Sequence, residues 1–166
     1  MAYQSVEQLV DESAAKAGLL QLSKTGNEFS FYCLNFTDSS NLRGSDRSLV
    51  NDKLLVGVAN LVLSLMGKRI IIAKTNKDRL ELVLPNLGKA QAVESAGQLR
   101  EQIEKNFCSK MPGLGLAIGL ASHPTDTDEK HNDLRHLAIL GADEATKLGM
   151  NRIFAAISAA DRANGK

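Results

Sequence analysis

The chain has 166 residues, a length that suits one domain with a full core and is short for two. Its 20 Lys and Arg residues against 19 Asp and Glu residues give a net charge of +1, which argues against binding nucleic acid through a broad basic face. The aromatic content is only 4% with no Trp, so base-stacking platforms for single strands are not expected either.

Neither a membrane segment nor a secretory signal is expected from the sequence. The most apolar stretch, 54–66, is interrupted by Gly57, Asn60 and Ser64 and is too short to span a bilayer. The first residues lack a basic region followed by an apolar run. Cys33 and Cys108 lie far apart and form no CxxC pair, which favours a reduced, cytoplasmic protein with two structural thiols.

Helical and strand-like patterns then alternate along the chain. Ser5 and Gln8 form a capping-box pair, and Gly18 follows an apolar stripe, which predicts a first helix ending near Gly18 that packs on the domain or on a partner. A turn-rich connection at 23–28 leads into a buried strand over 29–36, aromatic at both ends. The remaining pattern predicts a helix over 49–66, hairpin strands at 69–73 and 80–84 joined by the polar segment 74–79, a helix around 92–107, a strand at 114–121, a helix around 134–148 and a strand at 152–156.

This order predicts an α+β fold with a five-stranded, mostly antiparallel sheet, helices covering one face, and an extra N-terminal helix. We expect residues 1–28 to form the N-terminal helix and its connection. Residues 29–156 should form the single domain, and residues 157–166 a tail.

Paired carboxylates are the first chemistry to test for, because nucleotidyl transfer uses them to hold two metal ions. In this topology they would lie at the end of the first strand and in the hairpin turn. The hairpin offers Asp78, whereas the first strand ends with the neutral Asn35 and Thr37 before Asp38. Neutral side chains do not supply the charge that Mg²⁺ needs, so Asp38 is either a second ligand or only a loop-capping residue. We expect no metal and no cofactor.

Three other patterns are interpreted as structural. The glycines at 113, 115 and 119 fall inside a strand pattern, which indicates core glycines and not a phosphate loop. Histidines at 123, 131 and 136 lie near Asp126 and Asp128, but their spacing fits no metal-ligand motif and favours a solvated loop. Basic residues gather around the hairpin, either as a solvated sheet edge or as a site for an anion or an acidic partner: Lys68, Arg69, Lys74, Lys77 and Arg79.

The segment NKDRLELVLP at 76–85 resembles the signature segment of GGDEF domains, the diguanylate cyclase family. LGLAIGLAS at 114–122 and GMNRI at 149–153 are similar to two later segments of that family. The resemblance covers residues 29–154 and implies a nucleotide-cyclase, palm-like fold.

Within the signature, the resemblance implies several losses. The paired glycines fall on Asn76 and Lys77, the first acidic position survives as Asp78, the second becomes Arg79, and Leu80 replaces Phe. No inhibitory Arg-x-x-Asp motif is found at 67–70, so the resemblance implies no binding of the cyclic dinucleotide at that site.

Outside the signature, the family's Asp-x-Asp pair falls on Asn35 and Thr37, while Asp52 matches its base-reading Asp. Other positions that contact the nucleotide in the family are changed, namely Ser40, Arg43, Thr146 and Met150. The possible remnants of nucleotide binding are Asn35, Asp38, Asp52 and Asp78.

These losses predict a catalytically inactive GGDEF-like regulatory module in bacterial cyclic di-GMP-type signalling, which acts through a protein partner or a homo-oligomer. The basic hairpin (Lys74, Lys77 and Arg79) and the first helix are its expected contact surfaces. Two alternatives remain: a GTP sensor without turnover that uses Asp52, and a divergent nucleotide cyclase in which Asp38 and Asp78 hold metals and Asp52 or Lys74 touches the base.

Overall fold

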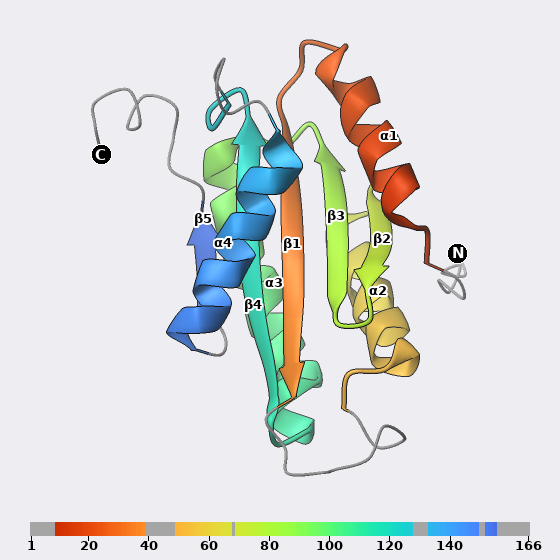
Figure 1. The fold of residues 1–166 in the computed structure, drawn as a ribbon, viewed down its shortest axis with the longest axis vertical. Helices are drawn as coiled ribbons and strands as arrows, with labels where there is room; N and C mark the ends of the chain where they lie inside the picture. Colours follow the sequence, from red (N-terminus) through yellow and green to blue (C-terminus); the bar gives the residue numbers. More distant parts are fainter. Residues whose placement is uncertain (1–8, 39–48, 68, 128–132, 150–151, 156–166) are drawn as a thin grey trace.

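The computed structural model describes residues 9–38, 49–67, 69–127, 133–149 and 152–155. Helices and strands alternate along the chain (Figure 1), and the α+β class predicted from the sequence is confirmed. The elements are α1 (Glu12–Ser23), β1 (Phe29–Asp38), α2 (Asp52–Met66), β2 (Ile71–Asn76), β3 (Arg79–Pro85), α3 (Lys89–Asn106), the short 3₁₀ helix η2 (Cys108–Lys110), β4 (Leu114–His123), α4 (Leu134–Leu148) and β5 (Arg152–Ala155).

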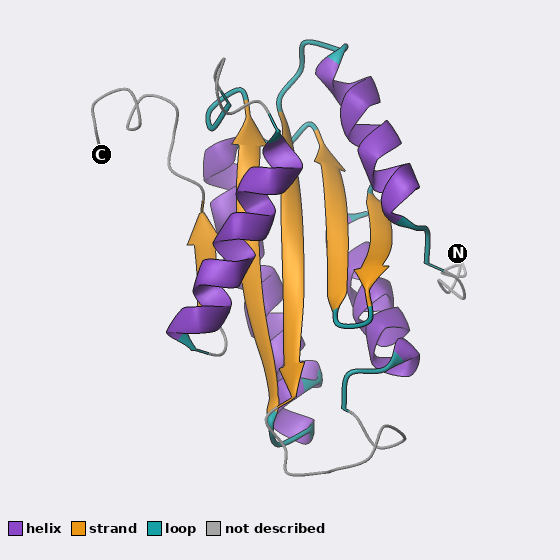
Figure 2. Cartoon of the chain, viewed as in Figure 1, coloured by secondary structure: helices purple, strands orange, loops and turns teal. Residues whose placement is uncertain are grey.

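The sheet has the strand order β2-β3-β1-β4-β5, with β1 at its centre (Figure 2). Strand β1 is antiparallel to both β3 and β4, and β2 is antiparallel to β3. The short β5 pairs in parallel with β4. The sheet is therefore mostly antiparallel, as predicted.

Helices cover both faces of the sheet, so the prediction that they cover one face is wrong. Figure 1 shows α1 and α4 in front of the strands and α2 and α3 behind them. Side chains of β1 alternate between two apolar clusters: Tyr32 and Leu34 pack with α2 and α3, whereas Phe31 and Cys33 pack with α1 and α4. Because successive strand residues point to opposite faces, the unbroken burial of residues 29–34 in β1 requires cover on both sides.

The first helix differs from its prediction at both ends. It begins after Asp11, whose side chain accepts a hydrogen bond from the Ala14 N–H at 3.2 Å, and it ends at Ser23. Ser5 and Gln8 lie outside the described residues. Gly18 does not end the helix but lies within it, where a Cβ would collide with Cδ1 of Ile71. The glycine thus lets α1 pack closely against β2.

The segment before α1 also contacts the sheet. The Lys74 N–H donates a hydrogen bond to the Val10 carbonyl at 2.9 Å, and Val10 pairs in parallel with Ala73 of the edge strand β2. The chain therefore adds a short backbone contact to this edge before the helix begins. Within the parts of the chain that the structure describes, no helix combines the length and apolar character needed to cross a membrane.

The predicted hairpin is confirmed, but its connection is shorter than expected. Strand β2 continues to Asn76 and β3 begins at Arg79, so only Lys77 and Asp78 form the turn. The pairing shifts register between Lys74 and Asn76, which accommodates the tight turn. As a result, Arg79 is a strand residue placed directly beside β1.

Candidate functional site

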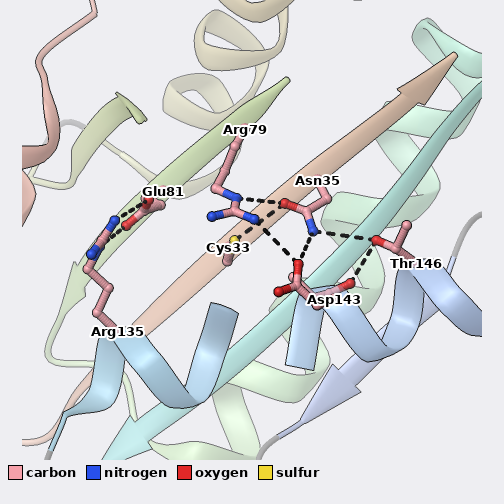
Figure 3. A network of polar contacts seen from close by, with 8 residues as sticks. Cys33, Asn35, Arg79, Glu81, Arg135, Asp143 and Thr146 are labelled. Atoms are coloured by element: carbon pink, nitrogen blue, oxygen red, sulfur yellow. Dashed lines mark hydrogen bonds and ion pairs between the residues drawn. The ribbon is translucent and has the colours of Figure 1, made fainter. Parts of the chain in front are cut away.

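Polar side chains gather where the ends of β1 and β3 meet α4 (Figure 3). The register pairs Asn35 of β1 with Arg79 of β3. Cys33 lies two residues before Asn35 and packs in the cluster beneath α4, so Asn35 shares that face of the sheet. The signature position and the first-strand position singled out in the sequence are therefore neighbours in the fold.

Four side chains form one connected set, which we call the Arg79 network: Asn35, Arg79, Asp143 and Thr146. Arg79 Nε donates to Asn35 Oδ1 at 2.9 Å, and Arg79 Nη2 donates to Asp143 Oδ1 at 3.4 Å. Asn35 Nδ2 donates to the same Asp143 oxygen at 3.2 Å and to Thr146 Oγ1 at 3.4 Å. The Thr146 hydroxyl donates in turn to the Ala142 carbonyl at 2.8 Å. Each of these four side chains therefore has a hydrogen-bond partner within the network.

Asp143 is the member that the sequence interpretation missed. It lies on α4, at 47% side-chain exposure, and forms an ion pair with Arg79. The sequence places it three residues before Thr146, one helical turn away, and that spacing is the signal that it shares a helix face with Thr146.

A second ion pair lies on the same face of the sheet. The Glu81 side chain is completely buried, and Arg135 of α4 holds it with two donors, Nε to Oε1 and Nη2 to Oε2, the latter at 3.0 Å. Arg135 Nη1 also lies 3.0 Å from Oε1 of Glu12 on α1. The hydrogen bond to Glu81 raises the pKa of Arg135. Arg135 therefore connects β3, α4 and α1 through its two ion pairs. In the sequence, the one sign of this arrangement is a charged residue, Glu81, within an apolar strand pattern.

Cys33 lies next to the Arg79 network, and its thiol is held in the protonated form. Its Sγ–H donates weakly to Asn35 Oδ1 at 3.7 Å, and the residue is fully buried. Burial raises the pKa of this thiol to about 12. The thiol therefore stays protonated at neutral pH, which fits the predicted structural role.

The remaining candidate residues make their recorded contacts outside the four side chains of the Arg79 network. Asp38 Oδ2 accepts a hydrogen bond from the Leu49 N–H at 2.9 Å, which supports the loop-capping interpretation. The Asp78 carbonyl accepts from the Phe36 N–H at 2.9 Å, so its backbone belongs to the sheet end. Asp52, with a side chain 82% exposed, forms an ion pair with Lys74 at 2.5 Å.

The other signature positions divide between surface and core. Asn76 and Lys77 are exposed at the turn, where Asn76 Oδ1 accepts from the Lys77 N–H at 2.8 Å. Leu80 is fully buried in the cluster beneath α2 and α3. Ser40, Arg43 and Met150 lie outside the described residues.

These residues do not fit the metal ions that the resemblance implies. The place of the second signature carboxylate holds a guanidinium, and the first-strand position holds a neutral amide, so Asp143 is the one carboxylate in the Arg79 network. Magnesium sites depend on carboxylate charge, which a neighbouring cation opposes. Among the described residues, no three His, Cys, Asp or Glu side chains gather as a metal site.

The histidine and glycine patterns have structural explanations. Asp126 is buried and accepts from Lys89 Nζ at 2.6 and 2.8 Å, so the solvated-loop interpretation is wrong for this residue. The ring of His123 stacks on Phe29, and His131 and Asp128 lie outside the described residues. Gly119 is confirmed as a core glycine, because a Cβ there would collide with the backbone of α4.

Comparison with known proteins finds similarity only at the level of structure. No family model and no curated protein matches the sequence. A GGEEF domain of a diguanylate cyclase from Vibrio cholerae superposes with a TM-score of 0.71 at 20% identity, covering 90% of this chain and 99% of that one. The GGDEF domain of TpbB (YfiN) from Pseudomonas aeruginosa gives a TM-score of 0.70 at 16% identity, covering 99% and 100%.

A third similar structure is the FimX GGDEF domain from Pseudomonas aeruginosa, with a TM-score of 0.69 at 19% identity over 92% of this chain and 98% of that chain. The chain therefore has the fold of a GGDEF domain, as the sequence resemblance implied. At these identities the likeness concerns the fold, and the chemistry has to be argued from the site itself.

Proposed function

We propose that this protein is a catalytically inactive, cytoplasmic GGDEF-like module of bacterial cyclic di-GMP-type signalling, which acts through contacts with a protein partner. The observation that carries the proposal is the Arg79 network. Side chains at positions where the resemblance implies metal and triphosphate contacts hydrogen-bond to one another at this end of the sheet.

The chemistry of the reaction explains why this arrangement opposes turnover. Phosphoryl transfer is catalysed almost entirely by positioning and by stabilising the charge on the phosphates. Loss of one such stabilising group commonly costs roughly 10²–10³ in rate, and groups that act together are not additive. The side chain of Lys77 also stands where the resemblance implies a glycine that lets phosphate approach the backbone.

A role in protein contacts is supported by the surface and by one structural neighbour. SiaD, a diguanylate cyclase from Pseudomonas aeruginosa, forms a complex with its activator SiaC, and this chain is similar to it with a TM-score of 0.67 at 13% identity. In the hairpin, Lys74 pairs with Asp52 and Arg79 lies in the network, whereas Lys77 is exposed at the turn. Leu20, 61% exposed on α1, marks a second place for a contact.

Turnover is tested by incubating the purified full chain with GTP or ATP and with Mg²⁺ or Mn²⁺, using an active GGEEF domain as the positive control. We expect no cyclic product above the no-enzyme background. Product that disappears in the Asp78→Ala variant would contradict the proposal and support the divergent cyclase.

Nucleotide binding is tested separately, by calorimetry with GTP, GDP and cyclic di-GMP. The proposal expects no binding heat. Heat with GTP that is lost in the Asp52→Ala variant, and kept in the Lys53→Ala control on the same helix, would support the sensor alternative instead.

The partner itself is tested by affinity capture from a bacterial lysate, together with light scattering of the isolated chain. We expect specific capture, or a homo-oligomer, that the Lys77→Glu or Leu20→Glu variant weakens. A monomer that captures nothing specific would contradict a role through protein contacts.

A further inference from the structure

We propose that the guanidinium of Arg79 is a built-in cation that takes the place of a metal ion at this end of the sheet. It would hold β1, β3 and α4 together without help from a divalent cation. The inference rests on the proposed function in one respect, because it treats the Arg79 network as the counterpart of the metal site that the resemblance implies.

The geometry of Arg79 suits this role. A guanidinium is always charged and carries five N–H donors in a rigid, planar fork. Here two of its nitrogens reach different elements, with Nε on Asn35 of β1 and Nη2 on Asp143 of α4. The side chain is 21% exposed, so its charge lies in a largely protein environment beside an opposite charge. One side chain thus joins three elements, since Arg79 itself belongs to β3.

Asn35 links the same residues from β1. Its Oδ1 accepts from Arg79, and its Nδ2 donates to Asp143 and Thr146. An ionised aspartate only accepts hydrogen bonds, so it could not bridge the cation and the anion in this way. An aspartate at position 35 would instead set a second carboxylate against Asp143. The amide and the guanidinium therefore fit one another as a matched pair.

The charges of the network are already balanced. Arg79 and Asp143 contribute one positive and one negative charge, and Asn35 and Thr146 are neutral. A divalent cation would add two positive charges beside the guanidinium with Asp143 as the network's one carboxylate. Hard cations such as Mg²⁺ and Mn²⁺ bind oxygen donors, carboxylates above all. The network therefore excludes a metal ion while supplying the link between elements that an ion could provide.

The proposal is tested with a variant that introduces an aspartate at position 35 and removes the guanidinium at position 79. The probe is Mn²⁺ alone, and free Mn²⁺ is followed by electron paramagnetic resonance in titrations of the full chain. We expect the wild-type chain and the Lys77→Ala control to bind no Mn²⁺ in the submillimolar range. The Asn35→Asp/Arg79→Ala variant should bind at least tenfold more tightly, and adding Asp143→Asn should abolish that gain.

Two results would overturn the proposal. One is wild-type chain that binds Mn²⁺ as tightly as the double variant, and the other is a folded double variant that binds no more tightly than wild type. Circular dichroism checks folding, and Asn35→Asp/Arg79→Gln replaces the double variant should it not fold. This titration contains no nucleotide. A negative result in it would contradict the Arg79 proposal alone, whereas GTP turnover by the wild-type chain would contradict the proposed inactivity.

Discussion

At the scale of single residues, Glu81 is a buried charge that depends on one partner side chain. It is a carboxylate with no exposed surface, and the fork of Arg135 accounts for both of its oxygens. A buried charge is tolerated only when it is paired and hydrogen-bonded. The pair therefore constrains the position of α4 relative to β3.

We predict that Arg135→Ala lowers the free energy of unfolding by about 3–5 kcal/mol, because it leaves an unpaired charge in the interior. Urea unfolding followed by circular dichroism measures the change. Replacing both partners, as in Glu81→Leu/Arg135→Met, should recover most of the loss, since no buried charge then remains at this position. Lys16→Ala, which removes only an exposed ion pair to Glu12, is the matched control and should leave the midpoint nearly unchanged. A midpoint for Arg135→Ala equal to that control would contradict the prediction.

Cys33 gives a pH-dependent prediction. Its folded-state pKa is raised to about 12 by burial from a reference value of 9.0. Between these values the unfolded chain loses a proton that the folded chain keeps, so stability present below pH 9 decreases as the pH rises toward 12. The slope of unfolding free energy against pH over this range should flatten in Cys33→Ala, and flatten less in Cys108→Ser, because the partly buried Cys108 thiol also has a raised pKa. Equal slopes in Cys33→Ala and wild type would contradict the assignment.

Some residue-scale features could be predicted from the sequence and others could not. The topology predicted from the sequence brings the end of the first strand to the hairpin turn, which places Asn35 near Arg79. The closure of the network by Asp143, and the burial of Asp126 under Lys89, depend on how a helix or loop crosses the sheet. No local pattern encodes that crossing.

At the scale of elements, α4 lies unusually close to β4. A Cβ at Gly119 would meet the carbonyl of Ala138 and the backbone of Ala142. The small residues of α4 that face the sheet, Ala138, Gly141, Ala142 and Ala145, are all buried and permit this approach. The contact positions Asp143 and Thr146 above β1, so it also shapes the Arg79 network.

We predict that Gly119→Ala destabilises the fold by about 1–3 kcal/mol, because backbone atoms of α4 must move to accept the methyl group. Gly97→Ala is the matched control: nothing lies within 4 Å of a Cβ there, and the residue lies inside α3. An alanine in the helix interior should stabilise by about 0.5–1 kcal/mol. Thermal unfolding compares the two variants, and a Gly119→Ala chain as stable as wild type would show that α4 adapts freely.

The boundaries of α1 show where element prediction fails. A glycine after an apolar stripe is a common helix stop, but here Gly18 serves close packing on Ile71. The strands were predictable as short apolar runs between polar segments, and the longer helices from the periodicity of their apolar residues. The two-sided cover of the sheet was implicit in the consecutive apolar residues 31–34 of β1.

At the scale of the whole molecule, buried apolar residues are unevenly distributed among the described elements. Strand β1 contributes residues to both apolar clusters, whereas α1 has Ala15 as its one fully buried residue. Local opening is easiest where few apolar contacts are buried. We predict that amides of α1 exchange with deuterium well before those of β1. Mass spectrometry of peptides from each element measures this, and equal protection of α1 and β1 would contradict the prediction.

The contact between Val10 and the edge strand β2 has a consequence for assembly. An open sheet edge can pair with strands of other molecules, because its backbone amide and carbonyl groups are free. The Lys74 N–H is already engaged by the chain's own Val10 carbonyl. Continuous β-augmentation along this edge would therefore first have to displace that intramolecular bond. If the domain acts through a partner as proposed, side-chain surfaces would give that partner the more accessible route.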